Sequence, residues 1–248
     1  NIIYIKKRKK NNLSLQKILI KKITCMRTKL FIISLLCMFA SANIYSQNET
    51  VIASDESGQH KGDLMEIEMN GGKPFMDVLR DKESMSNISP RDLEPHHLSG
   101  LFWAANGTPR RGEIHNRTAY APMEVQCVKM YVIMREGLFL YNAEPHKLRQ
   151  IAPIDYRLRI SDDNQVHRAP VVVIYVLSNE IGTAIKEESK LNYAYLQSGS
   201  ICQNINLYCS SEDMATNVYL DIKRDELAKK LNVKPTNILF GQAIGYRE

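Results

Sequence analysis

The chain has 248 residues, of which 44% are hydrophobic, and a formal net charge of +6. The excess positive charge lies at the beginning: residues 1–29 hold ten Lys and Arg and no Asp or Glu, which leaves 23 basic and 27 acidic residues in the remainder. A nucleic-acid-binding domain needs a basic surface, so this acidic remainder argues against that class of function.

Residues 26–47 have the composition of a secretory signal peptide. Basic residues come first, an apolar stretch follows at residues 30–40, and small residues come next. The stretch is shorter than the about 20 residues that a membrane-spanning helix needs, so no transmembrane anchor is expected after cleavage. We expect an exported protein, periplasmic or extracellular, that is cleaved after about Ala42 or Gln47.

The rest of the chain divides into a short tail and one domain. Residues 1–25, which precede Met26, are interpreted as an over-extended gene start rather than a domain. Residues 48–62 are polar and are expected to form a flexible tail. Residues 63–248 have the size of one domain.

The first half of this domain predicts two helices and a hairpin. Residues 89–92 combine a capping Ser, a Pro at the first helical position and an acid in the first turn, which are typical of a helix start. Asn106 and Gly107 form the matching stop signal. The other predictions are a short strand at 64–69, a short helix at 75–80, a polar loop at 108–120, and a hairpin of strands 128–134 and 138–141.

The second half is dominated by a long apolar helix. From residue 190 to about residue 211, apolar or small side chains occupy nearly every side, so the helix must be buried in the protein or in an interface. Gly199 and Ser200, in its middle, suggest close approach of another backbone. The apolar run 171–177 predicts a central strand covered on both faces. The chain then continues with a β-rich segment at 216–222, a helix at 224–231 and a closing strand at 237–246.

Residue types that often carry chemistry form no strong pattern. His96 and His97 are neighbours on the first long helix, where they would point about 100° apart, so they are interpreted as surface histidines. The three Cys beyond the leader form no C-x-x-C pair, which argues against a zinc site or a disulfide framework and for buried thiols. No P-loop, dinucleotide-binding glycine motif or nucleophile elbow occurs. No catalytic residue and no metal site are therefore predicted.

Several motifs, taken in their order along the chain, resemble the nitroreductase superfamily, especially its short branch near the SagB-type dehydrogenases. The resemblance covers roughly residues 72–247. The matching motifs are Trp103-Ala104-Ala105-Asn106-Gly107, the hairpin at 128–141, Gly199 with Gln203-Asn204, Ala215-Thr216, and the terminal strand from Gly241 to Tyr246.

The resemblance implies an α+β fold with a mixed, mainly antiparallel sheet, in a homodimer intertwined through the long helix. It also implies FMN in the groove between subunits, NAD(P)H as electron donor and a small-molecule electron acceptor. The residues that it assigns to FMN are Lys82, Ser84 and Ser86 at the phosphate, Gln126 from the partner's loop, and main-chain groups of Tyr219 and Leu220 at the ring.

The sequence departs from the family pattern at these same positions. The family's R-R-S-x-R is Lys82-Glu83-Ser84-Met85-Ser86 here, and the loss of guanidinium groups weakens the expected phosphate site. Glu124 replaces an amide donor, and the family's R-G near the ring is Tyr219-Leu220 here, so a bulky side chain stands where glycine is usual. Two functions follow: an FMN-dependent oxidoreductase that transfers a hydride from NAD(P)H to an acceptor, or an exported, flavin-free relative that serves as a binding or interaction module.

Overall fold

The structure is a computed structural model that describes residues 62–84, 87–109, 116–183 and 185–248. These residues belong to one compact unit. The interpreted gene start, the predicted signal peptide and the predicted tail up to residue 61 lie outside the described residues. Among the described residues, no helix combines the length and the apolar character that crossing a bilayer requires.

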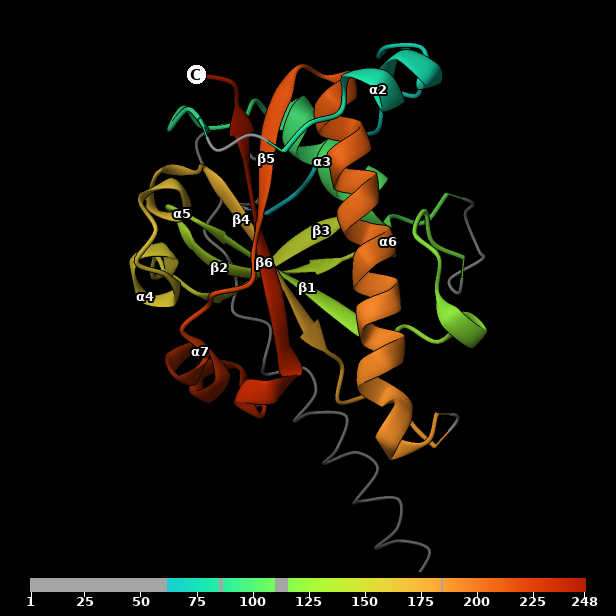
Figure 1. Ribbon diagram of the computed structural model, residues 1–248, viewed down its shortest axis with the longest axis vertical. Helices are drawn as coiled ribbons and strands as arrows, with labels where there is room; N and C mark the ends of the chain where they lie inside the picture. The colour runs from blue at the N-terminus through green and yellow to red at the C-terminus, as the bar shows by residue number, and fades with distance from the viewer. Residues whose placement is uncertain (1–61, 85–86, 110–115, 184) are drawn as a thin grey trace, which may run out of the picture. The chain divides into compact units, whose positions relative to one another are not determined.

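The centre of the domain is a six-stranded sheet with the strand order β3-β2-β1-β4-β6-β5 (Figure 1). All five pairings between these strands are antiparallel. The α+β class is therefore confirmed, and the sheet is antiparallel throughout its named strands. The bounds are β1 Val128–Met134, β2 Gly137–Asn142, β3 Lys147–Ala152, β4 Val171–Leu177, β5 Met214–Tyr219 and β6 Ile238–Tyr246.

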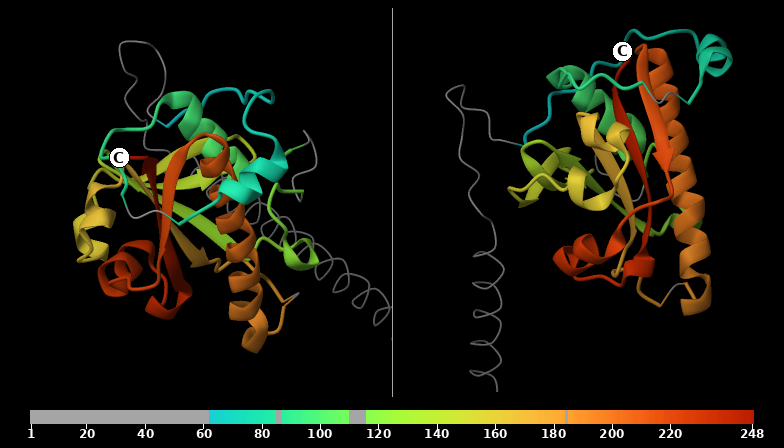
Figure 2. Two further views of the ribbon diagram at one scale, coloured as in Figure 1. Left: turned by 45° about the horizontal axis from the view of Figure 1, so that its top comes forward. Right: turned by 60° about the vertical axis from the view of Figure 1, so that its left-hand side comes forward.

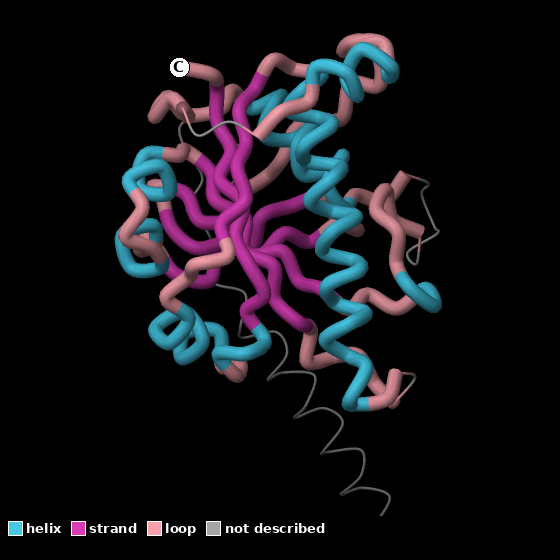
Figure 3. The backbone as a smooth tube through the Cα atoms, viewed as in Figure 1, coloured by secondary structure: helices cyan, strands magenta, loops and turns pink. Residues whose placement is uncertain are grey.

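Helices cover both faces of the sheet (Figures 1 and 3). One face carries α3 and α6, with α2 beside α6, and the other carries α4, α5 and α7 (Figure 2). Each layer encloses its own cluster of buried apolar side chains. The bounds are α2 Phe75–Asp81, α3 Pro95–Asn106, α4 Arg157–Ile160, α5 Asn164–Arg168, α6 Lys190–Ser211 and α7 Arg224–Leu231.

Strand β4 shows why the sheet has two covered faces. All seven of its residues are buried, as expected for an apolar run without alternation. Tyr175 and Val173 face the cluster under α3 and α6, whereas Ile174 and Val172 face the cluster under α4, α5 and α7. The prediction of a central strand at 171–177 is thus confirmed.

Helix α6 confirms the predicted long helix and divides its apolar residues between two sides. Ala194, Ile201 and Ile205 are fully buried against the sheet. On the opposite side, exposed side chains include Tyr195 and Leu196, at 50% and 53%. A Cβ at Gly199 would meet nothing within 4 Å. The close approach expected at Gly199 is therefore absent among the described residues, and the glycine faces outward.

Two predictions in the first half of the domain are wrong. Residues 64–69 form no strand, although their side chains alternate. The first long helix begins at Pro95, not at residue 89 or 90, because the preceding segment pairs with the end of β6. Ile88 bridges Arg247, and the backbone N–H of Ser89 donates to the carbonyl of Tyr246 at 2.9 Å.

The second half brings smaller differences. Strand β5 begins two residues before the predicted β-rich segment and ends at Tyr219. Strand β3, along with the short helices α4 and α5, occupies a region for which the sequence predicted no element. The hairpin, α2, α7 and β6 lie where they were expected.

Candidate functional site

A chain of buried hydrogen bonds joins α6 to strands β4, β5 and β6. The Gln242 side chain on β6 is fully buried. Its Nε2 donates to Asn206 Oδ1 on α6 at 3.0 Å and to Thr216 Oγ1 on β5 at 2.9 Å. Its Oε1 accepts a hydrogen bond from the Tyr175 hydroxyl at 2.6 Å. Because buried polar groups need such partners, this network fixes the spacing between α6 and the edge of the sheet.

Lys82 lies near the middle of α6, at the border of this network. The residue directly follows α2 and is half-buried. Burial raises the pKa of the Cys202 thiol to about 11, and the nearby Lys82 ammonium opposes that shift. A thiol with so high a pKa is protonated at neutral pH and a poor nucleophile. Cys202 is thus a packing residue, as expected, and Lys82 brings a cation close to the middle of α6.

Arg247 supplies a second cation that the sequence analysis missed. Its Nη1 lies 3.7 Å from Oε1 of Glu83. Its Nε is buried and has no hydrogen-bond partner among the described residues. Arg247 directly follows β6. Its position at the end of the predicted closing strand was the sequence feature that could have identified it as a site residue. Glu83, predicted to weaken a phosphate site, therefore faces a guanidinium.

The remaining phosphate candidates add little positive potential. Ser84 is exposed on the same segment as Lys82. Ser86 lies outside the described residues, so its predicted role stays a prediction. The cationic end of the site therefore rests on Lys82 and Arg247.

Strand β5 exposes one edge, because its only neighbour in the sheet is β6. Tyr219 packs against the cluster under α4, α5 and α7, on the face away from α6. Its neighbour Val218 points the other way and is 37% exposed, and Leu220 beyond the strand is 70% exposed. Side chains alternate along a strand, so the Tyr219 ring lies on the sheet face away from α6. The backbone of Tyr219 and Leu220 is partly engaged, because Tyr219 lies opposite Gly241 of β6 and the Leu220 carbonyl accepts a hydrogen bond from Arg224 Nη2 at 3.2 Å.

Gln126 is held by α6 on a different side. Gln197 is fully buried, and its Nε2 donates to Gln126 Oε1 at 2.8 Å. Its Oε1 accepts from the backbone N–H groups of Cys127 and Val128 at 2.7 and 3.0 Å. Gln197 and Cys202 are five positions apart, about 140° around the helix axis. Within one chain, Gln126 and Lys82 therefore lie on different flanks of α6.

The loop before Gln126 is strained. Met123 and Glu124 have φ angles of 54° and 59°, in the left-handed region that non-glycine residues rarely adopt. Both side chains are exposed. Two such residues in succession cost of order 1–3 kcal/mol each, and the anchor of Gln126 to the buried Gln197 holds the end of the loop in place.

The adjacent histidines lie closer together than the sequence analysis expected. Their ring centroids are 4.0 Å apart, and Glu94, His96 and His97 bring ligand-type atoms within 4.8 Å of one another. The prediction that the rings point apart is wrong, since the two rings lie close together in the first turn of α3. Arg91 pairs with Glu94 at 2.8 Å, so a guanidinium stands beside the cluster. That cation and the positive end of the helix dipole oppose a metal ion there.

Comparison with known proteins identifies the family. The model of a family described as "Nitroreductase family" matches residues 79–246. The chain belongs to the Nitroreductase family. Membership places it among oxidoreductases of the nitroreductase type, and the match spans α3, the whole sheet and α6.

A relative and two solved structures extend the comparison. A provisionally named nitroreductase of Methanocaldococcus jannaschii is 26% identical over 189 residues, which cover 72% of this chain and 96% of that protein. The crystal structure of a provisionally named nitroreductase from Ralstonia eutropha JMP134 has a TM-score of 0.69 at 22% identity, covering 82% and 96% of the two chains. A chain of the Escherichia coli microcin synthetase McbBCD complex with truncated pro-MccB17 bound has a TM-score of 0.57 at 13% identity, covering 82% and 86%.

These structures establish the nitroreductase-like fold. Within this family member, Lys82 lies near Cys202 of α6, and Arg247 lies beside Glu83 on the segment that follows α2. Gln126 lies on another flank of the helix. The predicted site residues therefore fall into two separate groups in one chain.

Proposed function

We propose that the protein is an FMN-dependent oxidoreductase that transfers a hydride from NAD(P)H to a small-molecule acceptor. The observation that carries this proposal is the buried Arg247 Nε, which has no hydrogen-bond partner among the described residues and lies beside the segment that holds Lys82 and Glu83. Family membership supports a redox function. Export through the predicted signal at residues 26–47 remains part of the proposal.

The residues present fit the phosphate of FMN, with one opposing group. A phosphate is held best by guanidinium donors. Arg247 supplies such a donor, although the family motif places its arginines in the segment that is Lys82 to Ser86 here. Lys82 supplies a second positive charge. Glu83 opposes binding because its carboxylate lies within 3.7 Å of Arg247, where it competes with the phosphate for the guanidinium.

In this proposal, each group has a distinct task. Lys82, Arg247 and Ser84 hold the phosphate, and the main chain at Tyr219 and Leu220 contacts the ring edge. FMN supplies the redox chemistry when it is bound. The chain's own residues orient it and exclude water, which explains why no side-chain nucleophile is needed.

A homodimer completes the proposed site. Gln126 would come from the partner subunit, since it lies on a different flank of α6 from Lys82. The exposed apolar residues Leu191, Tyr195 and Leu196, together with the open space at Gly199, would form the contact between the two copies. An amphipathic face of this kind is stabilised when a second helix covers it.

The second candidate function is a flavin-free binding or interaction module. The contact between Glu83 and Arg247 favours it, because the guanidinium proposed to hold the phosphate already faces an acid. Export would favour it as well, since nicotinamide donors are expected to be scarce outside the cell. The fold alone does not decide between the two functions.

A flavin titration separates the candidates. FMN is added to the purified mature protein, and quenching of flavin fluorescence is followed alongside the visible spectrum. Stoichiometric uptake that is weakened by Arg247→Gln, and not by Arg159→Gln on α4, supports the oxidoreductase. A colourless protein that takes up no FMN at any concentration rules the oxidoreductase out and leaves the binding module.

A further inference from the structure

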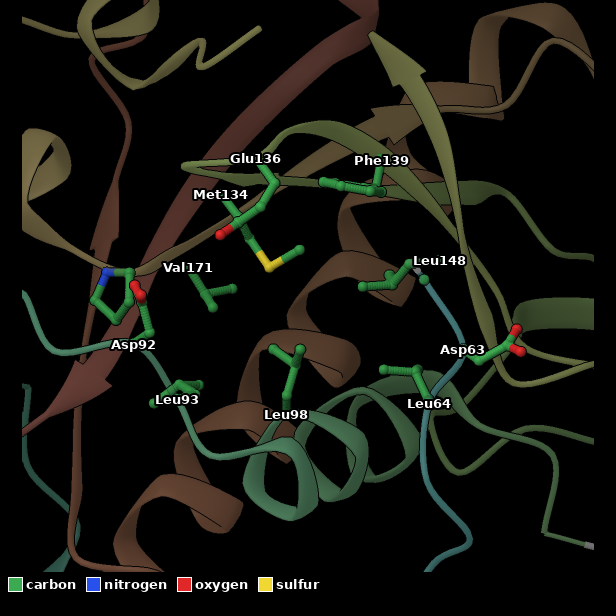
Figure 4. A pocket seen from close by; sticks show the side chains of 12 residues that line it. Asp63, Leu64, Asp92, Leu93, Leu98, Met134, Glu136, Phe139, Leu148 and Val171 are labelled. Carbon is green, nitrogen blue, oxygen red and sulfur yellow. The ribbon is translucent and has the colours of Figure 1, made fainter. Parts of the chain in front are cut away.

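A cavity lies beside α3, and none of the residues assigned to the proposed flavin site line it. Its volume is about 200 Å³, and its walls come from α3, the hairpin of β1 and β2, strand β3 and the start of β4 (Figure 4). No lining residue belongs to α6, β5 or β6. The cavity is therefore separate from the proposed flavin site, and the inference below does not depend on that proposal.

The floor and walls of this cavity are apolar. The side chains of Leu98, Met134 and Val171 point into the space (Figure 4). The other apolar residues of its wall are Leu64, Leu93, Phe139, Leu148 and Pro170. An apolar cavity of about 150 Å³ in another protein stays dry and binds benzene. A cavity of about 200 Å³ thus has room for one six-membered ring with a short side arm.

Carboxylates surround the opening. Asp92 and Glu136 lie on one side of the cavity, and Asp63 lies on the opposite side (Figure 4). Asp63 pairs with Lys147 at 2.9 Å, and Asp92 lies 3.6 Å from Arg135. Glu136 has no ion pair among the described residues. Three acids against two bases leave the rim with a net negative charge beside an apolar interior.

This combination selects the charge of a ligand as well as its size. The apolar interior stabilises a ring by removing it from water. The carboxylate rim attracts a cation attached to that ring and repels an anion, and the effect is stronger at the edge of an apolar wall than in open water. A neutral ligand of the same shape would keep the stabilisation from burial of its ring and lose the attraction to the carboxylates.

We propose that this cavity binds a small organic cation made of one apolar ring and a short ammonium arm. The ring enters between Leu98, Met134 and Val171. The ammonium group remains at the mouth, next to Glu136 and Asp92.

Three ligands of matched shape test the proposal. 2-Phenylethylamine, 2-phenylethanol and phenylacetate are titrated into the full-length protein, and binding is followed by ligand-observed NMR. We expect the amine to bind roughly fivefold more tightly than the alcohol, the gain expected from a solvent-accessible ion pair, and phenylacetate to bind most weakly. Equal affinities for the amine and the alcohol, or no binding of any ligand, would overturn the proposal.

Two exposed acids at the rim provide variants with little risk to folding. Glu136→Gln and Asp92→Asn should each lower the affinity for the amine about two- to fivefold and leave the affinity for the alcohol unchanged. Glu188→Gln, an exposed acid outside the cavity lining, is the control and should change neither. If Glu188→Gln weakens amine binding as much as Glu136→Gln does, the attraction is a general effect of net charge and the proposal fails.

A second copy of the chain could cover the same opening. In that case the affinity for the amine would fall as the protein concentration rises, and light scattering would show assembly that Leu98→Phe, which narrows the cavity, disrupts. That result would replace the small-molecule ligand with a protein partner. An affinity that is independent of protein concentration supports the proposal.

Discussion

Arg247 Nη1 lies 3.7 Å from Glu83 Oε1, and this contact joins the end of β6 to the segment after α2. The guanidinium is half-buried, whereas the acid is exposed. The pair lies at the proposed phosphate site. Whether an anion can bind there depends on the charge at residue 83, which makes that position the most informative one to change.

Replacing Glu83 should strengthen FMN binding. Glu83→Gln removes the competing carboxylate, and Glu83→Arg adds a forked donor, so affinity should rise by about tenfold for the first variant and more for the second. This gain corresponds to about 1.4 kcal/mol, close to the lower end of the range of about 1.5–3 kcal/mol for hydrogen bonds to charged groups. The measurement is the flavin titration described above. Glu226→Gln, an exposed acid on α7, is the control.

Substitution on the outer side of α6 should separate the proposed dimer. Tyr195→Glu or Leu196→Glu puts a charge into a contact that would otherwise be apolar, and a fully buried side chain of this size contributes about 1.5–3 kcal/mol. Size-exclusion chromatography with light scattering should show a dimer that dissociates at least tenfold more readily. Leu158→Glu changes an equally exposed leucine on α4 and should leave the mass unchanged. A wild-type protein that is monomeric at all concentrations contradicts this prediction.

Gln197 should contribute strongly to stability. Gln197→Leu keeps the volume but leaves the backbone N–H groups of Cys127 and Val128 without their acceptor. Each of the two buried donors left unsatisfied costs about 1–3 kcal/mol, so the free energy of unfolding should fall by about 2–6 kcal/mol. Urea unfolding provides the measurement, and Asn192→Leu, at an exposed site on the same helix, is the control. Equal effects of the two substitutions would show that the hydrogen bonds of Gln197 carry little of the stability.

Stability should decrease in mild acid. Burial lowers the pKa of His97, with His96 and Arg91 acting in the same direction and Glu212 and Glu94 opposing it. Burial also lowers the pKa of His146. The unfolded chain then binds more protons than the folded one just below the ordinary histidine pKa of about 6.5. The free energy of unfolding therefore falls as the pH drops through and below this value.

Urea unfolding between pH 7.5 and 5.5 measures this effect. The loss of stability should be smaller in the double variant His97→Gln with His146→Gln than in the wild-type protein. Identical pH profiles of the two proteins would assign the acid sensitivity to other groups.

The sequence predicted the elements that depend on local pattern. The apolar run of β4 and the long helix α6 were both visible because burial on both sides removes the usual alternation. The start of α3 was not, since the pairing of Ile88 with Arg247 joins residues that are far apart in the chain. The local capping signals at residues 89–92 could not reveal that the start of this segment pairs with the end of β6.

Only part of the candidate site could be predicted from the sequence, because the rest depends on contacts between residues that are far apart in the chain. Lys82 could be found from its motif, whereas Arg247 gains its meaning from a contact with Glu83 across the fold. Tyr219 and Leu220 could be found from their place in the family pattern, whereas the side of the sheet on which the Tyr219 ring packs is known only from the structure.

The placement of Gln126 and Lys82 on different flanks of α6 has a thermodynamic consequence. If a complete flavin site needs residues from both copies of the chain, flavin binding and dimerisation become linked equilibria, and each must promote the other. Dilution alone would then release flavin from a fully native chain. Saturating flavin would in turn hold the two copies together at concentrations where the bare protein comes apart.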